Sequence, residues 1–254
     1  MKAIWTISTL TVKEAVRNKF LYLLFFFALF LVCFSWVIGK FTVGDELKII
    51  KDVGISSIHF FGVIITIFIG IGLIFREMEK RTIYLILTKP LKRYQFIVGK
   101  FLGLAATLMI VLVALTVSFY IVLFVKGEPH PRYLWAFYLT YLEWLMISGV
   151  ALLFSSFSTP LLSAMLTLAT FLMGHLTESM LLLEQRIQSE TANWLLSALF
   201  YALPNLELFN IRAQMVHDLA IPQGFILQTS LYWLLYLAIL LLLAIRIFQQ
   251  KDFV

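Results

Sequence analysis

The sequence predicts an all-α, polytopic membrane protein with six transmembrane helices. Of its 254 residues, 61% are hydrophobic and only 13% are charged, and its mean hydropathy is +0.95. A soluble domain is about 45–50% apolar and about 25% charged. The composition therefore excludes a disordered chain, a nucleic-acid-binding domain and an ordinary soluble enzyme. The chain also holds several uncharged stretches long enough to cross a bilayer, which takes about 20 residues.

An amphipathic surface helix is expected at residues 3–19, before the first span. On a helical wheel Lys13, Glu14 and Arg17 fall within an arc of about 100°, and the apolar residue Ile4 lies away from it. Such a helix lies along the inner membrane surface. The alternative is a frayed cytoplasmic tail.

Six spans follow from the positions of the uncharged residues. The stretch 144–177 has 34 residues without a formal charge, which is too long for one span. It is divided at Ser155 to Pro160, where a polar turn precedes a proline that favours a helix start. The expected spans are about 20–39, 55–75, 101–125, 134–154, 160–177 and 225–245.

The segment 178–224, which follows the fifth span, is too long for a bare loop. Within it, residues 191–206 are uncharged but few for a span, and they include Pro204. We expect a re-entrant or interfacial helix here, with a seventh span as the alternative.

The basic residues predict the orientation of the chain. With six spans, 13 Lys and Arg residues lie on one side and seven on the other, which also holds most of the acidic residues. Since basic loops stay on the cytoplasmic side, both termini and the loop 76–100 are expected inside. The segments 40–52, 126–133 and 178–224 are then outside.

The loop 76–100 contains a short apolar run, Ile83 to Leu87, among charged residues and before Pro90. This run is far too short to span a membrane, so lipid headgroups or another protein must cover it. We expect a cytoplasmic helix at 77–88. The alternative is a solvated, positive-inside loop.

This loop resembles the first cytoplasmic loop of the ABC-2 type transporter permeases. That loop runs loosely as acidic–x–basic–Gly–Thr, a Leu-rich run, Pro–x–x–Arg, then Phe and Gly–Lys. Arg81 stands where Gly is usual. Residues 154–158, 204–210 and 248–253 are also similar to motifs of the family, and most of all to a small six-span subgroup named for multicopper-enzyme maturation. The matching loop residues are Glu79, Lys80, Thr82, Leu85, Leu87, Pro90, Arg93, Phe96, Gly99 and Lys100.

The resemblance implies the membrane subunit of an ATP-driven exporter in a bacterial or archaeal cytoplasmic membrane. It implies two permease copies, as a homodimer or with a sister permease, bound to two ATPase subunits. The 77–88 segment would be the coupling helix. The segment 178–224 would form an external gate over the dimer axis, and Pro204 and Asn205 would be residues of this gate. Surface helices packed on the spans are the alternative for this gate. The residues expected to contact the ATPase are Glu79, Arg81, Thr82, Ile83, Leu87 and Arg93, with Lys13 and Arg17 as weaker candidates.

The sequence shows no catalytic, cofactor or metal motif. It has no G-x-x-x-x-G-K-[ST] phosphate loop, so ATP is expected to bind to a partner subunit and this chain is not expected to be an enzyme. His59, His130, His175 and His217 are scattered, without the spacing of metal ligands. We therefore expect no metal site.

Glu143 is the main intramembrane candidate. It lies 11 residues after Arg132 and 12 before Ser155, about 16–18 Å from either end of its span. A carboxylate there costs about 2.5–3.5 kcal/mol, so it should be protonated, paired or facing water. We expect both Glu143 and His175 to line the translocation path or the dimer interface. The alternatives are a hydrogen bond with Tyr138 or Ser148, or a position at the outer headgroups.

Two other function classes stay open. An ion-coupled secondary transporter or channel would need several ionisable groups along a path, and only Glu143 and His175 qualify. A membrane assembly protein that does not transport is the third hypothesis.

Overall fold

The computed structural model describes residues 2–41, 44–79, 92–177, 193–194, 197 and 200–250. Every regular element within these ranges is a helix, which confirms the all-α class. Most of the predicted coupling helix, and the part of the external segment before Phe200 apart from three residues, lie outside the described residues. The elements are α1 (Lys2–Val16), α2 (Lys19–Lys40), α3 (Glu46–Glu79), α5 (Arg93–Val125), α6 (Tyr133–Ser155), α7 (Pro160–His175), the 3₁₀ helix η1 (Glu207–Phe209), α10 (Arg212–Val216) and α11 (Phe225–Gln250).

Five of the described helices are long and apolar enough to cross a membrane: α2, α3, α5, α6 and α11. The helix α7 is apolar but has only 16 residues, so the count of six spans stays a prediction. Two helices begin earlier than the spans expected from the sequence, α3 at Glu46 and α5 at Arg93. The uncharged stretches mark the apolar part of each helix, whereas the helices continue through flanking charged turns.

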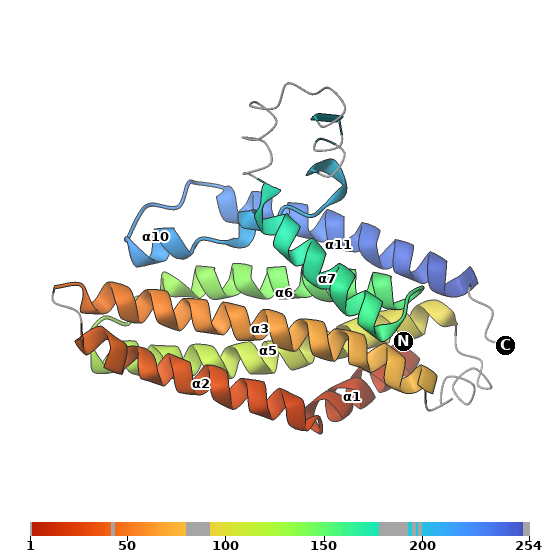
Figure 1. The fold of residues 1–254 in the computed structure, drawn as a ribbon, viewed down its shortest axis with the longest axis horizontal. Helices are drawn as coiled ribbons and strands as arrows, with labels where there is room; N and C mark the ends of the chain where they lie inside the picture. The colour runs from red at the N-terminus through yellow and green to blue at the C-terminus, as the bar shows by residue number, and fades with distance from the viewer. Residues whose placement is uncertain are drawn as a thin grey trace.

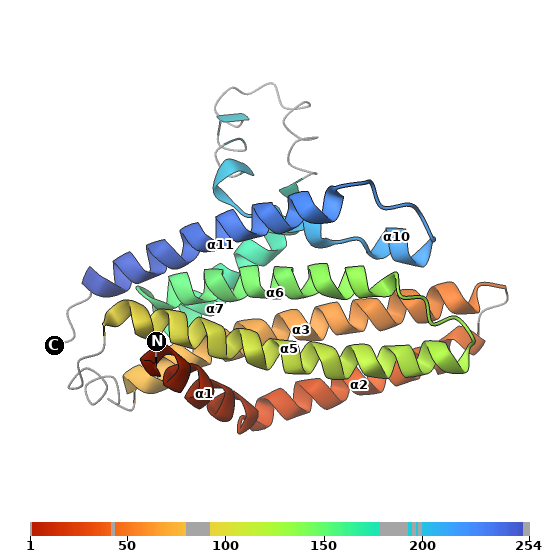
Figure 2. The ribbon, with the colours of Figure 1, turned by 180° about the vertical axis from the view of Figure 1, so that it is seen from behind.

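The helix α6 is the centre of the bundle. The helices α3 and α5 cover two of its faces, α11 runs along its upper edge, α7 crosses it obliquely, and α2 lies beyond α3 and α5 (Figures 1 and 2). Most of α6 is buried. In contrast, α2 and α11 expose large apolar side chains, such as Phe26, Phe30, Leu234 and Leu242. Such a surface suits contact with lipid chains.

A glycine lets α3 approach α6 closely. The side chain of Trp144 is fully buried and lies against Gly62. A Cβ atom added to Gly62 would lie only 1.6 Å from Cζ2 of Trp144. Small residues at helix contacts allow this approach in membrane bundles, so this pair fixes how α3 packs on α6.

A second close contact holds α1 on α5. A Cβ atom added to Gly103 would lie 2.5 Å from Cβ of Thr11, and one added to Gly99 would lie 2.8 Å from Cβ of Ile7. Between these glycines the side chain of Lys100 is 1% exposed, with its Nζ 3.4 Å from Oε2 of Glu14. We call these contacts the α1–α5 joint. Its tight packing shows that α1 is part of the bundle.

The first helix and the end of the last one lie at the same end of the bundle, together with the start of α5 (Figure 1). At the opposite end lie α10, the end of α2, the start of α3 and the turn from α5 to α6. Lys51 joins α3 to the loop after α10 at that end, since its buried Nζ lies 3.3 Å from Oδ2 of Asp218.

Candidate functional site

Three ionisable side chains from three helices meet inside the bundle. Oε2 of Glu143 on α6 lies 2.8 Å from Nε2 of His59 on α3, and Oε1 lies 2.9 Å from Nε2 of His175 on α7. Glu143 is only 1% exposed. Each carboxylate oxygen therefore has its own imidazole partner, which compensates the cost of burying the carboxylate.

The chain that follows α7 extends this cluster. Gly174 allows Pro204 and Leu206 to approach the end of α7, because a Cβ atom on Gly174 would lie 2.7 Å from the carbonyl oxygen of Pro204. The backbone N–H of Leu206 also donates to the carbonyl of Gly174, at 3.0 Å. This docking carries Glu207 to His175, whose Nδ1 lies 3.0 Å from Oε2 of Glu207. We call His59, Glu143, His175 and Glu207 the polar cluster.

Asparagine side chains hold Glu207 in place. Asn210 donates to Oε1 of Glu207 at 2.9 Å. Oδ1 of Asn205 accepts from the hydroxyl of Thr177 at 2.9 Å and from the backbone N–H of Glu207 at 3.1 Å. The predicted gate residue Asn205 thus lies beside the polar cluster and positions the segment that carries Glu207.

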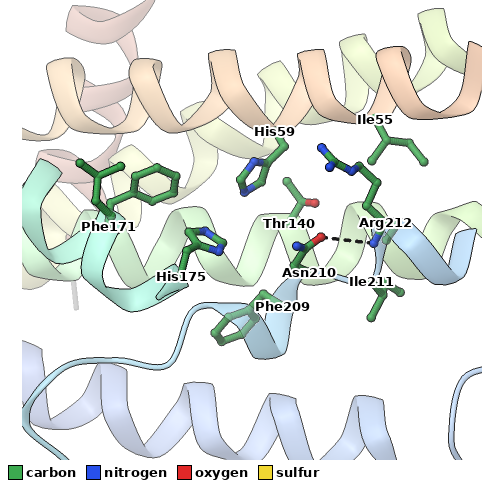
Figure 3. Close-up of a pocket in the computed structure, with 11 residues that line it drawn as sticks. Ile55, His59, Thr140, Phe171, His175, Phe209, Asn210, Ile211 and Arg212 are labelled. Carbon is green, nitrogen blue, oxygen red and sulfur yellow. Dashed lines mark hydrogen bonds between the residues drawn. The ribbon is translucent and has the colours of Figure 1, made fainter. Parts of the chain in front are cut away.

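A pocket of about 280 Å³ opens beside the cluster. Figure 3 shows the His59 and His175 rings on its walls, with Thr140 behind them and Arg212 nearby. Arg212 is held by Asp52, at 3.2 Å from its Nε, and by the hydroxyl of Ser56, at 2.7 Å from a terminal nitrogen. The pocket therefore gives the two imidazoles access to small polar species from the α10 end.

A larger groove of about 710 Å³ lies between α5 and α6. Its lining is apolar apart from Thr116 and the hydroxyls of three tyrosines, and no charged group converges on it. Such a groove can hold lipid chains, whereas the chemistry of the described residues gathers in the polar cluster.

The structure brings together the two intramembrane residues that the sequence singled out, Glu143 and His175. It does not support the sequence-based partners of Glu143. The hydroxyl of Tyr138 pairs with that of Ser230 at 3.0 Å, and Ser148 donates to the carbonyl of Leu145 at 2.7 Å. Tyr138 and Ser148 lie near Glu143 along the same helix, whereas the actual partners of Glu143 come from other helices.

Sequence reasoning missed His59 and Glu207. One signal pointed to His59, because it is the only ionisable residue between Val53 and Phe75. The spacing of the histidines along the chain does not reveal this grouping, since spacing relates only side chains within one element. In the folded chain, ligand atoms of His59, Glu143 and His175 lie within 4.8 Å of one another.

Most of the residues expected to contact an ATPase cannot be placed relative to the polar cluster, because they lie outside the part of the chain that the structure describes. Arg81, Thr82, Ile83 and Leu87 lie outside the described residues, and Glu79 ends α3 without a described side chain. Lys13 is exposed on α1, and Arg17 is exposed in the turn that follows it.

Arg93 has a contact that the sequence did not predict. Its guanidinium donates to the carbonyls of Phe248 and Gln249, at 3.2 and 2.8 Å. It thus links the start of α5 to the end of α11, where a cation also suits the helix dipole.

Apolar helices around a buried polar cluster define this chain as a multi-pass membrane protein. The family model of the ABC-2 family transporter proteins matches residues 5–253. The chain therefore belongs to the ABC-2 family, as its motifs predicted, and it is a membrane component of an ABC transporter. Membership implies a partnership with an ABC ATPase. No curated protein matches the chain.

Proposed function

We propose that this chain is the transmembrane subunit of an ATP-driven exporter. Two permease copies, identical or sister chains, would bind two ATPase subunits at the end of the bundle where α1 lies. ATP would bind to the ATPases, because this sequence has no phosphate loop. The main support is the α1–α5 joint, which lies at the end where α3 and α5 lead into residues 80–91.

The joint makes this end suited to transmit a movement. No side chain fits at Gly99 or Gly103 without displacing α1, so α1 and α5 move as one body. Arg93 links the end of α11 to these two helices through its hydrogen bonds to the carbonyls of Phe248 and Gln249. A displacement of residues 80–91 by an ATPase would then shift three helices against α6, because closely packed helices transmit displacements.

The coupling contact itself would be made by the helix expected at 77–88. Ile83 and Leu87 would insert as apolar anchors, with Glu79, Arg81 and Thr82 beside them and Arg93 at the rim. The exposed residues Lys13 on α1 and Arg17 just after it would extend the same surface. Buried apolar contacts carry most of the affinity at such interfaces, and rim charges set orientation.

The substitution Leu87→Asp tests this assignment. It should abolish co-purification with the ATPase and the ATP turnover of the complex, while insertion into the membrane stays normal. The matched control is Leu219→Asp at the opposite end of the bundle, where Leu219 is 54% exposed. If Leu87→Asp leaves complex formation and turnover unchanged, the coupling assignment is wrong.

Glu143 and His175 would line the translocation path on its outer side, with Pro204 and Asn205 as part of the outer gate. His175 lines the pocket and contacts Glu207, and Glu143 pairs with His175, which supports this placement. The topology behind it can be tested by cysteine labelling in a Cys33→Ser background. A cysteine at Gln250 should not react with an impermeant reagent added outside intact cells, and reaction there would refute cytoplasmic termini.

The polar cluster also favours a second candidate, an ion-coupled transporter. Four ionisable groups in contact are more than the sequence alone suggested. Proteoliposomes with the permease alone separate the two functions. Proton flux without the ATPase, abolished by Glu143→Gln, would support ion coupling. Activity only with the ATPase and ATP would support the exporter.

A further inference from the structure

We propose that His59, Glu143 and His175 form a binding site for a divalent transition-metal ion of the zinc class. The ligand atoms are Nε2 of each histidine and one carboxylate oxygen of Glu143. They come from α3, α6 and α7 and lie within 4.8 Å of one another. This inference rests on the geometry of the cluster and not on the proposed function.

The donor atoms need side-chain adjustments of up to about 1.5 Å to surround an ion. With bonds of about 2.0–2.1 Å, the donor atoms of a tetrahedral zinc site lie about 3.3 Å apart. The two imidazoles contact different oxygens of Glu143, at 2.8 and 2.9 Å, and the three donor atoms lie within 4.8 Å of one another. The contacting pairs must therefore separate by about half an ångström, and the most distant pair must approach by up to about 1.5 Å. The two rings stand nearly perpendicular, at 86°. Both nitrogens can therefore face one point beside the carboxylate.

The surroundings of His175 match those of a metal ligand. The other ring nitrogen of a ligating histidine usually donates a hydrogen bond to a carboxylate, which fixes the orientation of the ring and its tautomer. Here Nδ1 of His175 lies 3.0 Å from Oε2 of Glu207, and Glu207 is itself held by Asn210. The ring of Phe171 packs against the same imidazole, 4.8 Å between centroids. His175 is thus oriented for ligation before any ion binds.

A fourth coordination position would face the pocket. The rings of His59 and His175 border this space of about 280 Å³ on one side, with Thr140 and Asn210 also on its walls (Figure 3). Three protein ligands and one open position are the arrangement of zinc sites that take a water or an exchangeable ligand. The pocket is also the route by which an ion can enter.

The donor set selects the class of ion. Two imidazoles with one carboxylate suit zinc, copper, iron or nickel, whereas magnesium and calcium prefer oxygen ligands only. The charges also balance, because a divalent cation offsets the carboxylates of Glu143 and Glu207 when both imidazoles are neutral. The buried carboxylate of Glu143 then needs no other compensation.

Zinc binding to the full-length protein in detergent tests the proposal directly. Equilibrium dialysis with Zn²⁺ and elemental analysis should give about one ion per chain. His59→Ala and His175→Ala should each weaken binding more than 100-fold, and Glu207→Gln should weaken it about 10–100-fold. The control is a His130→Ala, His217→Ala double variant, which removes the other two histidines and should bind zinc like the unchanged protein. Zinc binding that is absent, or unaffected by the cluster substitutions, would overturn the proposal.

A second measurement needs no variant and so does not depend on whether a variant folds. The side chains of His59 and His175 are 27% and 21% exposed, which lets diethyl pyrocarbonate modify them. Saturating Zn²⁺ should slow modification of these two residues at least tenfold, measured by peptide mass spectrometry, and should leave the exposed His130 and His217 unaffected. Equal rates with and without zinc at His59 and His175 would mean that the cluster is only a hydrogen-bonded contact between helices.

Discussion

The α1–α5 joint and the polar cluster both bury charged groups between helices, but they are built in different ways. In the joint, two glycines bring the backbones together beside the ion pair of Lys100 with Glu14. In the cluster, four long side chains from separate elements meet beside a pocket of about 280 Å³. The joint leaves no room for another molecule, whereas the cluster has room for a small one.

This difference separates a mechanical role from a chemical one. Close backbone contact transmits displacement, because any shift of one helix produces steric overlap with the other. Hydrogen-bonded side chains beside a cavity can rearrange around a ligand at a lower cost. We therefore expect substitutions in the joint to change stability and coupling together. Substitutions in the cluster should affect binding or transport more than assembly.

The largest effect is expected from Gly103→Ala. Its new Cβ would lie 2.5 Å from Cβ of Thr11 and 2.7 Å from the backbone oxygen of Ser8, which cannot move away as a side chain can. We expect a loss of about 3 kcal/mol in the free energy of unfolding, measured by titration with a denaturing detergent.

The matched control is Gly70→Ala in α3, where the new Cβ meets Ala151 and Leu104 at an ordinary 3.4 Å. Here alanine should be neutral or stabilise by about 0.5–1 kcal/mol, because glycine is the poorer helix former. Similar losses at Gly103 and Gly70 would show that the joint is not under tighter steric constraint than the rest of the bundle.

The next largest effect concerns Glu143. Replacement by Ala leaves two histidines without their carboxylate partner and should cost about 2 kcal/mol. Replacement by Gln keeps the shape and part of the hydrogen bonding, so it should cost about 1 kcal/mol or less. Unfolding of both variants, compared with Glu128→Gln at a side chain that is 43% exposed, measures this difference.

Transport by the same variants decides the role of Glu143. A residue of the path should lose transport in both variants, because both remove the carboxylate. If Gln restores full transport and Ala does not, the residue only holds helices together and the proposed path role fails.

A smaller effect is expected from the segment that carries Glu207. Asn205→Ala removes the acceptor of the Thr177 hydroxyl and of the Glu207 backbone N–H, and should cost about 1 kcal/mol. A double-mutant cycle with Thr177→Val should give a coupling energy of about 0.5–1 kcal/mol. Strict additivity would mean that Asn205 does not hold this segment on α7.

The smallest effect is expected from Tyr138→Phe. It removes one exposed hydrogen bond between α6 and α11, at 3.0 Å from Ser230, and keeps the ring. A loss of about 0.5 kcal/mol or less is expected. If Tyr138→Phe lowered the free energy of unfolding as much as Glu143→Ala does, the polar cluster would not be more important for stability than other hydrogen bonds of α6.

Local composition was enough to predict the helices and the class of the protein. Long uncharged stretches must become helices in a membrane, since every backbone polar group has to be satisfied within the segment. The same sequence carried the family motifs, and it marked Glu143 and His175 because ionisable residues are rare at such positions. These conclusions need only local composition and length.

Which polar groups meet depends on how the helices pack in three dimensions. His59 and Glu143 are 84 residues apart, and His175 and Glu207 are 32 apart. Periodicity places side chains on the face of one helix, but it does not say which helix lies opposite or at what height. That is set by contacts such as Gly62 with Trp144 and Gly174 with Pro204, because steric fit between whole helices, and not local preference, fixes their register.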